Sequence, residues 1–371
     1  MPGLPMMRGK TPLLYKPDWE ETRERFRAWW AGEALGRCAL AVTARKAGVP
    51  DEPPPTAPTD PVQRWTDLGF IAALNDYEHR RTFYGGEAFP VWSGGYPGHT
   101  AIPAFLGCPT TLDLHTGWWD PILLEDEWRP EELQIDPGHP WYRFQLELLR
   151  TAAVASKGKS IPGVGAFGGC GDTLAALRGS MRLLYDLSDR PGLVRRTELH
   201  LMEMWTQVYQ TFYDIVFPSA GGSTCWFGLW SPGRFYAAQN DFSYMISPRM
   251  FTDLFLPALE LQLQFLDHAV YHVDGVDAFR HVPMLCDLPR LQALQILPGA
   301  GKPSPLHYLD VLKYVQSRGK NLHISIPPEE VEPALSELSA RGLFIHTWCR
   351  TEAEARSLLA RADTWSHSPV A

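Results

Sequence analysis

A repeated alternation of short apolar segments with longer amphipathic ones constrains this fold more than any other feature, and it continues to the end of the chain. The short segments end in Gly, Pro or polar residues and predict strands, whereas the helical spacing of apolar positions between them predicts helices. This order is typical of parallel βα units, in which helices cover the strands. The strand candidates are residues 88–93, 160–167, 223–230, 268–275, 293–299, 321–327 and 342–349, with an eighth expected within residues 110–123.

These units predict an α/β fold with a single closed (β/α)8 TIM barrel, because strands and helices alternate to the last residues and leave no separate second domain. A chain of 371 residues with 45% hydrophobic residues can bury a core of that size. We expect residues 85–365 to form the barrel. Residues 1–84 are expected to form an N-terminal extension that packs on it, with a helix over 18–36, a short strand over 38–44 and a proline-rich loop over 49–63.

The charge pattern limits the kinds of partner. The formal net charge is -8, and Lys and Arg are not clustered, which argues against a nucleic-acid-binding surface. A small-molecule substrate is therefore expected. No segment is apolar for long enough to cross a membrane, and residues 1–10 lack the apolar stretch of a secretory signal, so we expect a cytoplasmic protein without membrane contact. The six cysteines form no CxxC pair and should be reduced.

Three blocks in the second half of the chain resemble the uroporphyrinogen decarboxylase superfamily. They are GDTLAALRGSMRLLYDLSDRPGLVRR (171–196), NDFSYMISPRMFTDLFLPAL (240–259), and YHVDG (271–275) followed by the segment 321–349. This superfamily includes zinc-dependent methylcobamide:thiol methyltransferases and is related to cobalamin-independent methionine synthase. The resemblance implies a TIM barrel with its active site at the carboxyl ends of the strands, a zinc ion, a corrinoid methyl carrier on a partner protein, and pairing into a homodimer.

The differences from true uroporphyrinogen decarboxylases place the chain nearer the methyltransferase branch. Those decarboxylases carry a P-x-W-x-M-R-Q-A-G-R segment whose arginines pair with porphyrin carboxylates, and residues 16–30, KPDWEETRERFRAWW, lack it. Burying a substrate with many carboxylates would be costly without such cations. The methyltransferases usually present His-x-Cys on one strand, where this chain has His272-x-Asp274.

His272 and Asp274 are the first candidates for chemistry. Residues two apart on a strand point to the same face, so both side chains would project into the barrel or its mouth. Cys349 resembles the family's final cysteine ligand, and the three residues together would suit a catalytic zinc site with one open position. His346 has the opposite parity to Cys349 and is expected on the outside. Two alternatives stay open: His272 acts as a base without a metal, or it is a core histidine hydrogen-bonded to Asp274.

Asp241 is the second candidate, as a catalytic acid or base, because it precedes a helix start where the family carries an acidic residue near its substrate. Its alternative is an ordinary capping role. A Gly-rich stretch after a strand, tryptophans and a strand histidine are candidates for contacting the substrate, with core packing as the equal alternative for the tryptophans. These residues are Gly168, Gly169, Trp118, Trp119, Trp226, Trp230 and His323.

The resemblance and the candidate ligands together predict a metal-assisted group-transfer enzyme, with methyl transfer or demethylation of a small molecule as the reaction. Two other functions remain open. One is a decarboxylase or lyase without a metal, in which Asp241 and His272 protonate a carbanion. The other is a carbohydrate-active or ligand-binding barrel, in which the tryptophans stack on the ligand.

Overall fold

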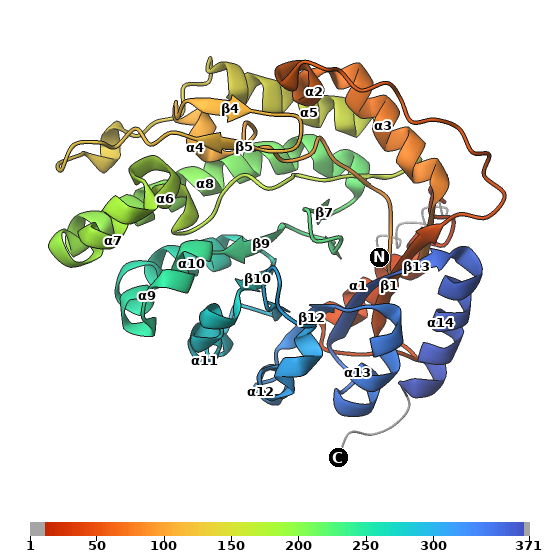
Figure 1. The fold of residues 1–371 in the computed structure, drawn as a ribbon. Helices are drawn as coiled ribbons and strands as arrows, with labels where there is room; N and C mark the ends of the chain where they lie inside the picture. Colours follow the sequence, from red (N-terminus) through yellow and green to blue (C-terminus); the bar gives the residue numbers. More distant parts are fainter. Residues whose placement is uncertain (1–11, 367–371) are drawn as a thin grey trace, which may run out of the picture.

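The computed structural model describes residues 12–366 and shows an α/β fold built on a mainly parallel seven-stranded sheet (Figure 1). The strand order is β2-β1-β13-β12-β11-β10-β9, and only the edge strand β2 runs antiparallel to its neighbour. Most side chains on both faces of these strands are buried, as parallel sheets covered by helices require. The strands are β1 (Ala39–Arg45), β2 (Thr82–Gly86), β9 (Phe235–Gln239), β10 (His268–Asp274), β11 (Ala293–Leu297), β12 (Asn321–Ser325) and β13 (Leu343–Thr351).

Six further strands are short and form three separate pairs. β3 (Val91–Trp92) and β6 (Ile161–Pro162) are parallel, whereas β7 (Ser223–Thr224) with β8 (Trp230–Ser231) and β4 (Thr110–Leu112) with β5 (Gly117–Trp119) are antiparallel. Backbone hydrogen bonds continue from β3 to β6 and on to β7, through Gly163 N to Trp92 O at 3.2 Å and Val164 N to Thr224 O at 3.0 Å. β3, β6 and β7 therefore lie side by side, in the order in which they occur in the sequence.

The helices fall into two groups along the chain, and the second group follows the outside of the main sheet in Figure 1. α14 begins with a capping box, in which Thr351 and Glu354 bond each other's backbone amides. The first group is α1 (Trp19–Trp30), α2 (Pro61–Thr66), α3 (Leu68–Arg81), α4 (Ile102–Phe105), α5 (Pro140–Ala155), α6 (Asp172–Arg178), α7 (Ser180–Asp189) and α8 (Pro191–Ala220). The second is α9 (Pro248–Leu254), α10 (Leu256–Phe265), α11 (Val282–Cys286), α12 (Leu309–Ser317), α13 (Val331–Glu337) and α14 (Glu352–Trp365).

The structure corrects four of the expected strands. Residues 88–93 and 160–167 contain only the two-residue strands β3 and β6, which pair with each other outside the main sheet. Residues 110–123 hold no strand of the main sheet, because they fold back as the β4–β5 hairpin, whose turn Asp113 closes by accepting hydrogen bonds from the amides of His115 and Thr116. Residues 223–230 are not one strand but two short ones with a turn between them. β9, which was not among the predicted strands, pairs with β10 at the edge of the main sheet.

The N-terminal region contributes directly to the main sheet. β1 lies within the segment expected to be an extension, yet it pairs in parallel with β13, with Ala39 opposite Phe344 and Val42 opposite Thr347. α1 is held to the same part of the sheet, since Trp29 Nε1 donates to Gly342 O at 2.9 Å. The first and last strands of the chain are therefore direct neighbours.

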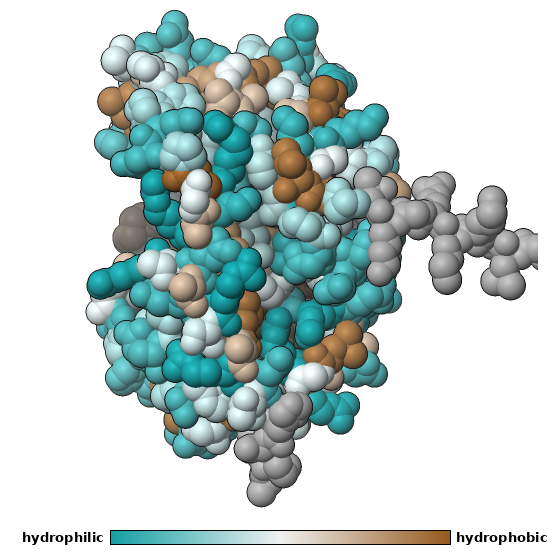
Figure 2. Space-filling model, turned by 90° about the vertical axis from the view of Figure 1, so that its right-hand side faces the viewer, coloured by the Kyte–Doolittle hydropathy of each residue, from teal (hydrophilic) through white to brown (hydrophobic). Residues whose placement is uncertain are grey.

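Hydrophilic residues cover most of the face in Figure 2, and apolar residues appear there only as small separate patches. Among residues 12–366, no helix combines the length and the apolar character needed to span a bilayer. The segment 1–10, on which the expectation of no secretory signal rests, lies outside the described residues.

A buried ion pair joins the N-terminal segments to one another. Glu87 directly follows β2 and is fully buried. Its carboxylate accepts hydrogen bonds from Arg37 at 2.7 and 3.1 Å and from the amide of Leu40 at 2.5 Å, and Arg25 of α1 lies 3.4 Å away. One carboxylate thus holds α1, the start of β1 and the end of β2 together.

Substitution Glu87→Ala should lower the free energy of unfolding by roughly 3–5 kcal/mol, because it leaves the buried Arg37 guanidinium without its counter-charge. Urea unfolding followed by circular dichroism measures this change. Asp51→Asn is the control, since Asp51 pairs with Arg45 and Arg81 at the surface and should have little effect. Equal losses in the two variants would contradict the structural role given to Glu87.

Candidate functional site

The parallel register places a row of polar side chains on one face of the main sheet. Gln239 of β9 lies opposite His272 of β10, His272 opposite Gln295 of β11, and Gln295 opposite His323 of β12. Residues opposite one another in a parallel sheet share a face. Asp274, two residues after His272, therefore extends this row toward the carboxyl end of β10.

Asp241, His272 and Asp274 form a compact group at that end of the sheet. One ligand atom from each side chain lies within 4.8 Å of the other two. His272 Nε2 is 3.8 Å from Asp274 Oδ2. Asp241 begins a short 3-10 helix, η2 (Asp241–Met245), two residues after the end of β9, so two neighbouring strands deliver the group. The structure thus brings together the three residues predicted to act in catalysis.

Gln295 determines how the imidazole of His272 faces this group. Its Oε1 lies 2.5 Å from His272 Nδ1 and accepts the hydrogen on that nitrogen. The Nε2 lone pair is then directed toward Asp274. Fixing the tautomer of a histidine through its second nitrogen is how proteins prepare an imidazole for a metal or a proton.

A third carboxylate, Asp172, lies beside the group and was missed in the sequence. Its oxygens accept hydrogen bonds from Gln239 Nε2 at 3.0 Å and from the amide of Phe242 at 2.9 Å. It begins α6, where Gly171 has a φ of 75° and touches the Asn240 side chain so closely that a Cβ would meet Asn240 Oδ1 at 2.1 Å. Only glycine permits this approach of α6 to the end of β9.

The carboxylates influence each other's protonation. Enclosure by protein, followed by the neighbouring charges of Asp172 and Asp274, raises the pKa of Asp241 to about 7. Burial also raises the pKa of Asp172, although its hydrogen bonds act in the opposite direction. Like charges in one site are not ionised together at low cost. Near neutral pH, Asp241 can therefore give or take a proton.

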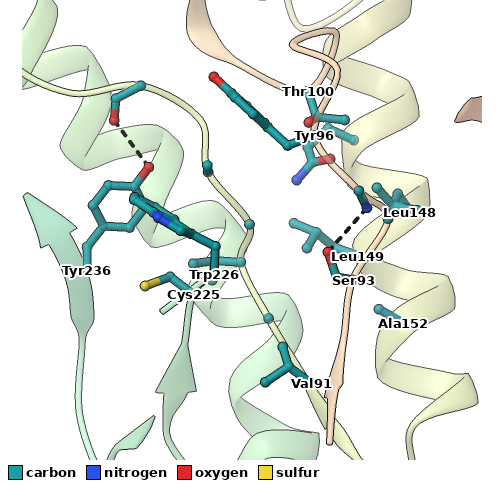
Figure 3. A pocket seen from close by; sticks show the side chains of 18 of the residues that line it. Val91, Ser93, Tyr96, Thr100, Leu148, Leu149, Ala152, Cys225, Trp226 and Tyr236 are labelled. Carbon is teal, nitrogen blue, oxygen red and sulfur yellow. Dashed lines mark hydrogen bonds between the residues drawn. The ribbon is translucent and has the colours of Figure 1, made fainter. Parts of the chain in front are cut away.

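A pocket opens directly beside the group. One part has a volume of about 320 Å³ and is lined by Asp241, His272 and Gln239 and, beyond them, mainly by aromatic, aliphatic and glycine residues, with the polar side chains of Ser93, Thr100 and Gln145 among them. An adjoining part of about 670 Å³ reaches Asp172, and the two parts share Tyr96, Gly168, Gln239 and Asp241. Figure 3 shows Tyr96, Leu148 and Leu149 on one side of the first part and Trp226 and Tyr236 on the other.

The residues predicted to contact substrate are only partly brought together. Gly168 and Trp226 line the first part of the pocket and Trp119 the second. Gly169 packs against Gln239. Trp118, 49% exposed, lies on the β4–β5 hairpin and is not among the residues lining the two parts.

Trp230 and His323 were predicted to contact the substrate, but both side chains are buried among other residues. Trp230 is fully buried under α1, where it packs edge-on against Trp19. His323 is on the same face as His272, but its ring is covered by the rings of Phe227 and Phe344, with centroids 5.6 and 5.2 Å away. Burial lowers the pKa of His323 to about 3, so it is neutral at ordinary pH.

Cys349 does not join the group, which corrects its prediction as a ligand. β13 runs from Leu343 to Thr351, and its pairing with β1 becomes irregular after Trp348. The residues around Cys349 place its side chain on the face opposite to His346. His346 is opposite Ser325 of β12 and faces inward with His323. Cys349 faces the helices, in a separate hollow lined by residues of α14 and by Glu332 of α13. The structure therefore replaces Cys349 by Asp241 in the set of candidate ligands.

Comparison with known proteins found a similar structure but no similar sequence. No family model matches the chain, and no curated protein matches it in sequence. A methyltransferase from Methanosarcina mazei has a similar structure, with a TM-score of 0.62 and 12% sequence identity over 94% of this chain and 99% of that one. The chain therefore has a methyltransferase-like α/β fold over nearly its whole length.

Asp241 should make the stability of the metal-free protein depend on pH. Folding raises its pKa from 3.8 to about 7, so the native state keeps a proton that the unfolded chain releases. This contribution is fully present below about pH 4 and is lost as the pH rises through about 7. Compared with the wild type, Asp241→Asn should therefore gain more stability at about pH 8 than at about pH 5, as measured by urea unfolding.

Asp51→Asn provides a control of opposite sign, because hydrogen bonds from Arg81 and Arg45 lower the pKa of Asp51. Stability from Asp51 is therefore present at high pH and lost on acidification. A stability difference between Asp241→Asn and wild type that is the same at both pH values would contradict the raised pKa.

Proposed function

We propose that this protein is a metal-assisted group-transfer enzyme that moves a methyl group to or from a small molecule held beside Asp241, His272 and Asp274. The observation that carries the proposal is the convergence of these three side chains within 4.8 Å at an open pocket, with His272 oriented by Gln295. The fold shared with a methyltransferase supports it. The proposal includes a closed (β/α)8 barrel and a place in the methyltransferase branch of the uroporphyrinogen decarboxylase superfamily.

The three side chains fit a divalent metal such as zinc. Two carboxylates and one neutral imidazole supply three ligands, the number found in catalytic zinc sites that keep one position open. Gln295 gives His272 the outer partner that metal-binding histidines normally have. When bound, such a metal supplies Lewis acidity that lowers the pKa of a thiol or water and creates a nucleophile at neutral pH.

The chain's own residues would then position and protonate the reactants. Asp241 belongs to the ligand group and also lines the pocket, so its carboxylate would hold the proton that leaves the acceptor whenever it is not bound to the metal. Trp226 and Tyr236 on one side of the pocket and Leu149 on the other provide apolar walls and limit the access of water. A corrinoid protein as methyl carrier and a homodimer belong to the proposal through the resemblance alone.

A decarboxylase or lyase without a metal is the second candidate. The observation that favours it is the pair Asp172 and Asp241, whose raised pKa values permit a protonated carboxyl beside an ionised one. Such a pair can protonate a carbanion. Metal content separates the two candidates, because this second reaction proceeds in metal-free protein.

Purified protein should contain about one divalent metal ion per chain, consistent with a single three-ligand site. His272→Ala and Asp274→Asn should each reduce the content well below one, because each removes a ligand. Inductively coupled plasma mass spectrometry measures this content, and circular dichroism confirms folding. Cys349→Ser is the control and should keep its metal, since Cys349 lies on the opposite face of β13. Metal-free wild-type protein with full activity would reject the proposal.

Gln295→Leu should weaken metal binding by about 10- to 100-fold, because His272 loses the partner that fixes its tautomer. Competition with a chromogenic chelator measures the affinity. Gln295→Glu restores an acceptor for His272 Nδ1 and should recover most of the binding. Unchanged affinity in Gln295→Leu would show that His272 is not oriented through this contact.

A further inference from the structure

We propose that the pocket beside Asp241 binds a small organic cation with a methylated nitrogen, that is, a tertiary or quaternary ammonium group. The conclusion that this cation is the methyl-bearing substrate rests on the proposed function. The conclusion that the pocket binds such a cation rests only on the walls and charges of the pocket.

Aromatic rings form the part of the pocket that a cation would contact. Tyr96 and Trp226 line the pocket and are 48% and 39% exposed, so their rings are not fully covered by other residues. They come from opposite sides of the pocket, and Tyr236 packs edge-on against Trp226 with ring centroids 5.1 Å apart (Figure 3). Open faces of Trp and Tyr attract cations through their ring quadrupoles, and quaternary ammonium groups are recognised in this way.

The charges of the pocket favour a positive ligand. Asp172 and Asp241 line it and Asp274 lies within the ligand group, whereas no Lys or Arg is among the described residues that line either part. With two of the three carboxylates ionised, a divalent metal would bring the site to neutrality rather than to a positive charge. An anionic substrate would have to enter this field without a counter-charge, which is costly in an enclosed site.

The distribution of acceptors separates a methylated cation from a primary amine or a sugar. A primary ammonium has three N–H donors and a sugar has many hydroxyls, and each of these groups needs a partner once buried. Val91, Leu148, Leu149 and Ala152 offer none, and away from the ligand group and the tyrosines the polar side chains of the lining are those of Ser93, Thr100 and Gln145. An N-methylated nitrogen needs few or no such partners, so aromatic and aliphatic walls suit it.

The amide oxygen of Gln145 on the pocket wall can accept a hydrogen bond from the ligand. Gln145 of α5 lines the pocket and is 3% exposed, and its Oε1 has no hydrogen-bond partner among residues 12–366. A buried amide oxygen without a donor is unfavourable. A hydroxyl elsewhere on the ligand would satisfy it. The volume of about 320 Å³ is within the range of small-molecule sites.

Isothermal titration calorimetry with choline and with its neutral isostere 3,3-dimethyl-1-butanol tests the proposal. The two probes have the same shape and hydroxyl and differ in charge, so choline should bind at least tenfold more tightly. Trp226→Leu should weaken choline binding by tenfold or more, and Trp226→Phe, which keeps an aromatic face, should weaken it less. Equal binding of the two probes, or binding of glucose in place of choline, would overturn the proposal.

Tyr96→Leu and Tyr185→Leu form a matched pair of variants. Tyr185 is an exposed tyrosine of α7 outside the pocket, so its substitution should leave choline binding unchanged, whereas Tyr96→Leu should weaken it. Metal content is measured on the same samples. Choline binding to protein that has no metal site supports the cation site and rejects the proposed function, whereas metal binding without choline binding rejects the cation site alone.

Discussion

The parallel register of β9, β10, β11 and β12 is the constraint on which the whole site depends. It aligns Gln239, His272, Gln295 and His323 in one row across four strands. Two members of the row hold other side chains in place: Gln295 orients His272, and Gln239 donates a hydrogen bond to Asp172. A shift of one residue in any of these strands would turn its polar side chain toward the helices and leave it without a partner.

The sequence predicted the second half of the fold better than the first. β10 to β13 follow the predicted segments closely, because long apolar runs between good helices mark buried parallel strands. β9 was missed because FYAAQ is short and stands between two Gly- and Asn-containing turns rather than between helices. The hairpin at 110–119 looked like a strand because its turn, closed by Asp113, leaves no Pro or Gly signal of its own at that position.

The site was predictable where strand periodicity decides it and unpredictable where distant segments meet. His272 and Asp274 share a face by alternation alone, and Asp241 follows a helix-start pattern. Alternation also places His346 inward and Cys349 outward, but only if the strand is known to continue to Thr351. Asp172 has no such signal, since its neighbour Asp241 is far away in sequence and they are brought together by the close contact of Gly171 with Asn240 and by the hydrogen bonds of Asp172 to Gln239 and Phe242.

The pairing of β1 with β13 has a consequence for how the protein reaches its native state. β1 leaves the ribosome early, but the strand that covers one of its edges begins only at Leu343. Until then its amides and carbonyls on that side are open to pairing with another chain. Contacts of such sequence separation slow folding, so the nascent protein passes through a long interval in which it is exposed to aggregation and to chaperones.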